Sequence, residues 1–137
     1  MNLQQRLDDI IAEHMEDRSI MMTLDVYGLN AGNVFFRNRP EVFRLLDRVE
    51  EFLQFTDNPL LEQRAFMELF HLDRDVRRMT QVIPQQRLFN SYPESRFDNN
   101  PRYCYRPGDL LIHFAGMTLE DVAKEMRRYR KAMLKTS

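Results

Sequence analysis

One histidine, His113, lies near the C-terminal end of a short apolar run that stops at a glycine. The run reads Gly108-Asp-Leu-Leu-Ile-His-Phe-Ala-Gly116. Its successive apolar residues predict a strand over residues 109–115 that is buried on both faces, as in α/β sheets. Open α/β sheets bind ligands at the carboxyl ends of their strands, so this imidazole is a candidate ligand for a metal or a phosphate. The alternative is a core histidine that is hydrogen-bonded to a backbone carbonyl.

The composition excludes several classes of protein. The chain has 137 residues, which suits a single domain, and its formal net charge of −1 gives no overall field that would attract nucleic acid or a membrane. Its one cysteine rules out an internal disulfide framework and a zinc cluster built from several cysteines. No stretch approaches the roughly 18 apolar residues that span a bilayer, and no signal peptide is evident. The chain alone is therefore expected to be soluble.

The apolar periodicity predicts a mixed α/β fold. Strands are expected over residues 20–26, 33–37, 81–83 and 109–115, with a turn at Gly28 and Gly32. Residues 88–107 hold three prolines without periodicity and are expected to form a long functional loop. No βα unit precedes the first strand, so the chain looks like the second part of a larger fold. Four helices are also expected, each with one apolar stripe. The first stripe is Leu3, Leu7, Ile10, Ile11 and His14, and the second, after Pro40, is Val42, Leu45, Leu46, Val49, Phe52 and Leu53. The third, after an Asn58 cap and Pro59, is Leu61, Ala65, Phe66, Leu69 and Phe70, and the fourth, after a Thr118–Asp121 cap, is Leu119, Val122, Met126, Tyr129 and Met133.

Four stretches in this order resemble one glycosyltransferase family. They are residues 28–38 (Gly-Leu-Asn-Ala-Gly-Asn-Val-Phe-Phe-Arg-Asn), 58–66 (Asn-Pro-Leu-Leu-Glu-Gln-Arg-Ala-Phe), 83–93 (Ile-Pro-Gln-Gln-Arg-Leu-Phe-Asn-Ser-Tyr-Pro) and 108–116. Together they are similar to the C-terminal half of the galactosyl- and mannosyltransferase family of the fungal Golgi, which includes the plant xyloglucan xylosyltransferases. The resemblance covers roughly residues 20–130.

This resemblance implies the C-terminal portion of a GT-A (nucleotide-diphospho-sugar transferase) fold, a mixed sheet with flanking helices. Residues 1–137 would be a single partial domain whose N-terminal nucleotide-binding half is missing. It also implies transfer of a hexose with retention of configuration, and a divalent metal, usually manganese, that neutralises the leaving diphosphate. His113 takes the place of the family's metal-binding histidine. The family's Asp-x-Asp pair lies on a strand end upstream of this region and is not found there, because Asp8 and Asp9 are adjacent and lie on an amphipathic helix.

The same resemblance assigns the remaining site residues. Glu62 and Gln63 match the acid–Gln pair that stabilises positive charge beneath the anomeric carbon. Asn30 and Gly32 match an Asn-x-Gly turn that contacts donor or acceptor hydroxyls, and Gly116 would let backbone amides approach the diphosphate. Each has a simpler reading: Glu62 would favour its helix dipole, and Asn30 and Gly32 would only form a turn.

The implied partners are a nucleotide-sugar donor and an oligosaccharide or glycoprotein acceptor, with possible complexes among related glycosyltransferases. No nucleic acid is expected, and the family's Golgi membrane location would require an anchor that this chain does not carry. A basic cluster over residues 124–135 is expected to be a solvated helix face. Aromatic residues of the 88–107 loop would either stack on an acceptor sugar or anchor the loop. Two other functions stay open: a non-catalytic remnant or binding subunit of a glycan-synthesising complex, and an unrelated α/β interaction module.

Overall fold

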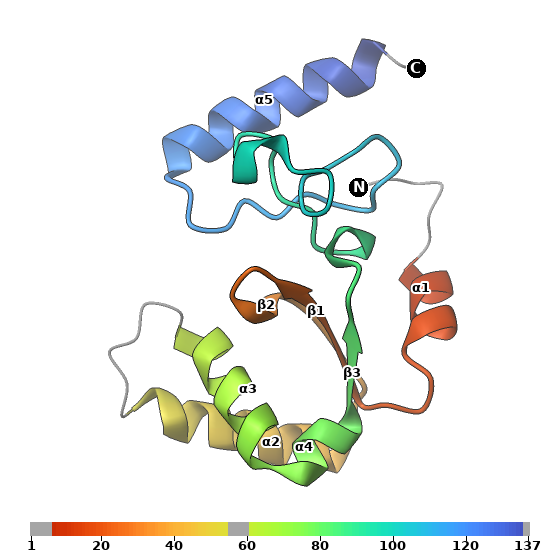
Figure 1. Cartoon of the computed structure of the whole chain (residues 1–137), viewed down its shortest axis with the longest axis vertical. Coiled ribbons are helices and arrows are strands. Elements are labelled where there is room, and N and C mark those ends of the chain that lie inside the picture. Colours follow the sequence, from red (N-terminus) through yellow and green to blue (C-terminus); the bar gives the residue numbers. More distant parts are fainter. Residues whose placement is uncertain (1–6, 55–60, 136–137) are drawn as a thin grey trace.

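The centre of the molecule is a three-stranded mixed sheet. The computed structural model of the chain describes residues 7–54 and 61–135. The strands are β1 (Ile20–Asp25), β2 (Gly28–Phe36) and β3 (Thr80–Ile83), in the order β2-β1-β3 (Figure 1). β1 pairs antiparallel with β2 and parallel with β3. The mixed α/β fold and the strands expected over 20–26 and 81–83 are thus confirmed.

β2 is longer than expected and contains an irregularity that matters for the site. The predicted turn at Gly28 and Gly32 is wrong, because both glycines belong to β2 and the hairpin turns at residues 26–27. The pairing jumps from Met21–Phe35 to Thr23–Asn30, so residues 31–34 of β2 face only Met22 of β1. Such a bulge redirects the strand and re-aims its side chains.

Helices cover one face of the sheet. α2 (Pro40–Leu53), α3 (Leu61–Leu72) and the short α4 (Arg74–Met79) lie below the strands in Figure 1. Alternate residues of β1 point to opposite faces, so Ile20 and Met22 pack against these helices while Met21 faces the other way. The helix side of this core is formed by Val42, Leu45, Val49, Ala65, Phe66, Leu69 and Val76.

The predicted helix stripes are confirmed in their central residues and wrong at some ends. α2 has the expected bounds, but Leu46 is 37% exposed and Leu61, at the start of α3, is 50% exposed. The predicted Asn58 cap and Pro59 lie outside the described residues. α4 was not predicted; the side chain of Asp73 caps it by accepting from the backbone N–H groups of residues 75 and 76.

The opposite face is covered by α1 (Leu7–His14) and by the irregular segment 84–118. Of the predicted α1 stripe, Ile10 is buried, Leu7 is exposed and Leu3 lies outside the described residues. Ile10 packs with Met21, Ile83, Phe89 and Leu110 in a second apolar cluster. The loop expected over 88–107 is confirmed, with two 3-10 turns, η1 (Gln86–Leu88) and η2 (Phe97–Asn99).

The predicted buried strand over 109–115 is wrong. This segment makes only an isolated bridge, between Ile112 and Ser91. Its apolar sequence favours an extended chain, but a strand also needs a neighbour, and the neighbouring residues 90–92 offer little pairing. The segment therefore runs beside the loop rather than within the sheet.

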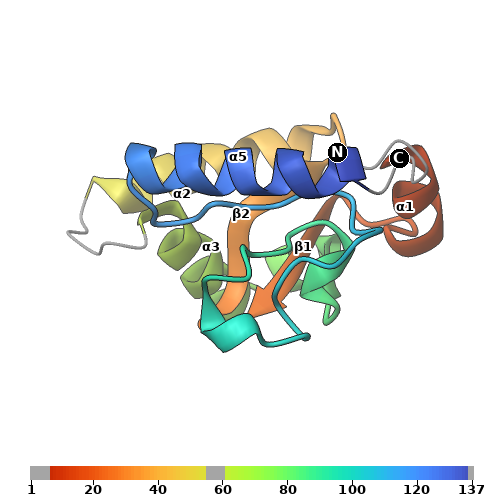
Figure 2. The ribbon, with the colours of Figure 1, turned by 90° about the horizontal axis from the view of Figure 1, so that it is seen from above.

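The last helix, α5 (Leu119–Lys135), crosses over the loop on the side away from α2–α4 (Figures 1 and 2). Its predicted capping residues are confirmed, since the backbone N–H of Asp121 donates to Thr118 Oγ1 at 3.2 Å. The predicted stripe is partly wrong: Leu119 is 90% and Met126 57% exposed, while Tyr129 is buried. Met133 has no described side chain. Among the described residues, no helix combines the length and apolar character needed to cross a membrane.

Candidate functional site

A cavity opens where the β1–β2 hairpin, the start of α3 and the 84–118 segment meet. Its volume is about 390 Å³, within the range of small-molecule sites. It is lined by Asp25, Tyr27, Asn30, Gly32, Leu61, Glu62, Gln63, Tyr92, Arg96, Phe97, His113, Ala115 and Gly116. The structure thus brings all six residues singled out from the sequence, Glu62, Gln63, Asn30, Gly32, Gly116 and His113, to the wall of one cavity.

His113 is held against the bulged part of β2. Its backbone N–H donates to the carbonyl of Ser91 at 2.7 Å. A Cβ atom on Gly32 would lie 1.8 Å from His113 Cε1, so only glycine lets the imidazole lie this close to the β2 backbone. The bulge therefore turns the backbone of Gly32, which has no side chain, toward the imidazole.

The imidazole has an unused nitrogen. Nδ1 of His113 is buried and has no hydrogen-bond partner among the described residues. This argues against a core histidine whose Nδ1 is satisfied by a backbone carbonyl. Burial lowers the pKa of His113, and the positive charge of Arg96 lowers it further, while Asp25 opposes the shift. At neutral pH the imidazole is therefore uncharged.

Asn30 lies at the centre of a buried polar network. Its Nδ2 donates to Asp25 Oδ2 at 2.6 Å and to the hydroxyl of Tyr92 at 2.7 Å, and its Oδ1 accepts from the backbone N–H of Gly32 at 2.8 Å. Tyr92 in turn donates to Asp25 Oδ2 at 2.9 Å. Burial and the Asp25 carboxylate raise the pKa of Tyr92, so its hydroxyl stays protonated. These bonds fix the hairpin to the loop at the cavity wall.

A second buried asparagine extends the network into the sheet. Asn90, which is fully buried, donates to Thr23 Oγ1 at 3.1 Å and to Asn30 Oδ1, and accepts from Asn33 Nδ2 at 3.0 Å. Buried polar networks whose members are bonded rigidify the segments they join. The loop carrying Tyr92 is therefore placed by the sheet, although it belongs to no strand.

Asp109 holds the segment that leads to His113, residues 108–116, in place beside the loop. Its carboxylate makes a two-point ion pair with Arg87, at 2.7 and 2.9 Å, and accepts from Ser91 Oγ at 2.8 Å. It also accepts from the backbone N–H of Arg106 at 2.9 Å. This pairing raises the pKa of Arg87. Ordering of residues 108–116 thus depends on a carboxylate that follows Gly108 directly, rather than on strand pairing.

Glu62 and Gln63 project from the first turn of α3. Gln63 Oε1 accepts a hydrogen bond from the backbone N–H of Ala31 at 3.3 Å, which joins the helix to the bulge of β2. Glu62 is exposed at the cavity wall. Leu61 before it has a left-handed backbone (φ 36°), which is uncommon for a residue other than glycine and is typical of strained functional positions.

The residues fit a metal only in part. The buried, unpartnered and uncharged Nδ1 of His113 has the chemistry of a single imidazole ligand. Within residues 7–54 and 61–135, no three side chains of His, Cys, Asp or Glu are grouped to hold an ion. The described part of the chain therefore offers one ligand and not a full coordination shell.

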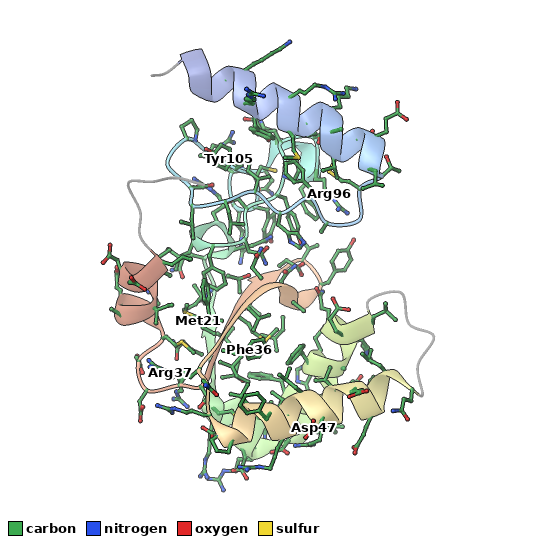
Figure 3. All side chains as sticks on the ribbon, turned by 180° about the vertical axis from the view of Figure 1, so that it is seen from behind. Met21, Phe36, Arg37, Asp47, Arg96 and Tyr105 are labelled. Carbon is green, nitrogen blue, oxygen red and sulfur yellow. The ribbon has the colours of Figure 1, made fainter. Side chains whose placement is uncertain are left out.

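Sequence reasoning missed several residues of this wall. Asp25 is the last residue of β1 and the residue before the end of the strand expected over 20–26, so a carboxylate near a strand end was an available signal. Tyr92 and Phe97 belong to the loop aromatics, and Tyr92 both lines the cavity and anchors the loop. Arg96 belongs to no sequence motif, and only the folded structure shows that it lines the cavity. It lies in the loop region below α5 (Figure 3).

The chain is similar to yeast proteins that are named as probable galactosyltransferases. It is 28% identical over 115 residues to the probable alpha-1,2-galactosyltransferase gmh2 of Schizosaccharomyces pombe, covering 82% of this chain and 31% of the relative. The probable alpha-1,2-galactosyltransferase gmh1 of the same yeast is 28% identical over 116 residues, covering 83% and 33%. The chain thus spans about a third of the length of the curated relatives it matches. No solved structure matches it. Because residues 2–122 match the family pattern, the chain belongs to the galactosyl transferase GMA12/MNN10 family.

Proposed function

We propose that this chain forms part of the catalytic site of a retaining hexosyltransferase, which moves a sugar from a nucleotide-sugar donor to an oligosaccharide or glycoprotein acceptor. The relatives' names favour galactose as the sugar. The observation that carries the proposal is that the six residues chosen from separate segments of the sequence line one cavity.

Each wall of the cavity has its own task in this reaction. As the bond between C1 of the sugar and the diphosphate breaks, its electron pair leaves with the diphosphate and positive charge develops at C1. The Glu62 carboxylate stabilises this charge, and the Gln63 amide orients the sugar beneath it. The acceptor hydroxyl oxygen then bonds to C1 on the face that the diphosphate left, and its proton passes to the departing diphosphate.

The β2 bulge and the 113–116 segment bind the donor. The bare backbone of Gly32 contacts sugar hydroxyls, and Asn30 holds that backbone at the cavity wall by accepting from the Gly32 N–H. The backbone at Gly116 approaches the diphosphate. His113 contributes one ligand to a divalent cation, in this proposal manganese, which supplies charge neutralisation of the diphosphate when bound. Supporting this role, Nδ1 of His113 is buried without a partner.

The whole enzyme would be a GT-A transferase, with the nucleotide-binding strands and the Asp-x-Asp pair in the part of the family's length that this chain does not span. The sheet agrees with this arrangement, since β2 and β3 lie at its two edges in the described residues and leave backbone groups for further strands. The Golgi is the compartment in which such a protein would act, in possible complexes with related transferases.

A chimaera tests the function directly. The region of the S. pombe gmh2 protein that matches this chain is replaced by residues 1–137, and transfer of galactose from UDP-galactose is measured with manganese. We expect transfer, and a loss of at least about tenfold in His113→Ala and in Glu62→Gln. Glu68→Gln is the matched control, because Glu68 lies on the same helix, pairs with Arg64 and does not line the cavity. Unchanged transfer by the His113→Ala chimaera would contradict the proposal.

A further inference from the structure

Two polar groups in the cavity wall lack partners. Three buried side-chain atoms in the described part of the chain have no hydrogen-bond partner, and two of them, Arg96 Nη1 and His113 Nδ1, belong to residues that line this cavity. Buried polar atoms in folded proteins are nearly always satisfied by protein, water or a ligand. Their concentration at one cavity indicates that a ligand completes it.

Arg96 is held firmly in place without using its charge. Its guanidinium carbon lies 5.6 Å from the ring centroid of Tyr92 and 5.7 Å from that of Phe97, in the loop region between the strands and α5 (Figure 3). Its backbone N–H donates to the carbonyl of Pro93 at 3.0 Å, and its carbonyl accepts from the thiol of Cys104 at 3.0 Å. Aromatic faces orient a guanidinium but leave its N–H groups free to bind an anion.

Two nearby carboxylates, those of Asp25 and Glu94, bond to other residues. Asp25 accepts from Asn30 and Tyr92, and Glu94, two residues before Arg96, pairs with Arg128 and Arg106. Among the described residues, no acidic side chain forms an ion pair with Arg96. Arg96 therefore lines the cavity without a direct ion-pair partner, although the carboxylates of Asp25 and Glu62 line the same cavity.

A glycine lets the guanidinium of Arg96 lie close to the backbone of the 113–116 segment. A Cβ atom on Gly116 would lie 3.3 Å from Arg96 Nη1 and 3.7 Å from Nη2. Gly116 also has a left-handed backbone (φ 63°), which glycine adopts without strain. On the other side, Gly32 leaves room for His113, whose ring stacks on Tyr92 at 5.6 Å between centroids. Arg96 and His113 thus flank the same tyrosine.

We propose that Arg96 is the cationic half of an anion subsite that binds the diphosphate of the nucleotide-sugar donor. A guanidinium matches phosphate oxygens with two parallel N–H bonds, and it would stabilise the negative charge that builds on the leaving diphosphate. The identity of the anion as the donor's diphosphate rests on the proposed function, whereas the anion subsite itself does not.

Arg102 provides a matched control. It lies in the same loop, its guanidinium carbon is 5.5 Å from the ring centroid of Tyr103, and it is exposed and does not line the cavity. The two arginines therefore share charge, loop and aromatic contact, and they differ in access to the cavity. An effect of Arg96 alone cannot come from net charge or from stacking in general.

The test is calorimetric titration of the chain with inorganic pyrophosphate in metal-free buffer, and then with UDP-galactose. We expect wild-type binding that weakens with salt, a loss of about tenfold or more in Arg96→Gln, an intermediate affinity in Arg96→Lys and no change in Arg102→Gln. Pyrophosphate binding that is absent in the wild type, or equal in wild type and Arg96→Gln, would overturn the anion subsite. If Arg96→Gln does not fold by circular dichroism, Arg96→Lys and Gly116→Ala decide in its place, since both should weaken pyrophosphate binding.

The second ligand separates the two proposals. If UDP-galactose binds equally well to wild type and Arg96→Gln, the inference about Arg96 fails while the donor site stands. If pyrophosphate binding depends on Arg96 and UDP-galactose does not compete for it, the anion subsite stands while its assignment to the donor, and the proposed function, fail.

Discussion

The sheet with α2–α4 and the 84–118 segment are stabilised by different interactions. Below the sheet, apolar residues of periodic elements interdigitate, with Ile20, Leu45 and Phe66 buried among them. Above it, a smaller apolar cluster that includes Phe89 and Leu110 is joined by specific polar bonds, such as the two-point ion pair of Arg87 with Asp109. The first region can exchange one apolar residue for another, whereas each polar bond of the second requires a particular partner. The cavity lies where the two regions meet.

The titrating groups divide in the same way. Hydrogen bonds to arginine or serine lower the pKa values of Asp17, Glu41 and Asp73, all below or beside the sheet. Burial raises the pKa values of the loop and α5 groups Tyr92, Cys104, Tyr105 and Tyr129. The stability of the region below the sheet is therefore expected to fall at acidic pH, and the stability of the loop and α5 at alkaline pH.

The largest effect is expected from a cavity in the apolar region. Leu45 is 1% exposed in the centre of that core, so Leu45→Ala should lower the free energy of unfolding by about 2–5 kcal/mol. Leu119→Ala, at a residue that is 90% exposed, should have almost no effect. Urea unfolding followed by circular dichroism measures both. Equal losses would mean that the assignment of the core to α2–α4 is wrong.

Gly32→Ala tests the junction of the two regions. The added methyl group would overlap the His113 ring, so we expect a loss of about 1–3 kcal/mol from forced repacking, together with weakened ligand binding. In a His113→Ala background the same substitution should cost much less, because the clash is gone. A double-mutant cycle by thermal unfolding measures this coupling, and additive losses would contradict the contact.

Tyr92→Phe tests the polar network above the sheet. It removes a hydroxyl that donates to Asp25 and accepts from Asn30, and should lower the free energy of unfolding by about 1 kcal/mol. Tyr27→Phe is the control, because Tyr27 is 56% exposed. If denaturant midpoints of the two variants coincide, the network contributes nothing to stability.

The smallest effect concerns alkaline pH. The neutral forms of Tyr92, Cys104 and Tyr105 are favoured in the folded state, because their pKa values there exceed the unfolded values of 10.0, 9.0 and 10.0. Their contribution to stability is complete below about pH 9 and is lost as the pH rises toward the folded-state values. The melting temperature should therefore fall above pH 9, and less steeply in Tyr105→Phe. An identical slope in the variant would mean that Tyr105 does not contribute to the loss of stability at alkaline pH.

Most of the scaffold could be predicted from the sequence, because periodicity reports burial. Val42, Leu45 and Val49 follow a helical period and are buried as expected. The prediction failed where burial depends on a distant partner. α5 buries Glu125 and Tyr129 and leaves Met126 exposed, because Tyr129 packs on Tyr105 and Phe114 of the 84–118 segment. The run at residues 109–115 is not a strand, since pairing depends on neighbours that periodicity does not reveal.

The residues of the candidate site could also be predicted only in part. Glu62, Gln63 and His113 were found by resemblance and share one cavity, although their roles stay predictions. Asp25 and Arg96 were not found, because their significance depends on where a non-periodic loop lies. The polar bonds of Asn30, Asn90 and Asp109 help to determine that position, and no short sequence pattern encodes them.

We propose that this cavity binds a nucleotide-sugar donor with a metal at His113. The most direct measurement is calorimetric titration of the 137-residue chain with UDP-galactose, with and without manganese, in wild type and His113→Ala. We expect manganese to tighten donor binding to the wild type and not to His113→Ala. Donor binding that is absent, or equally strengthened by manganese in both proteins, would contradict it.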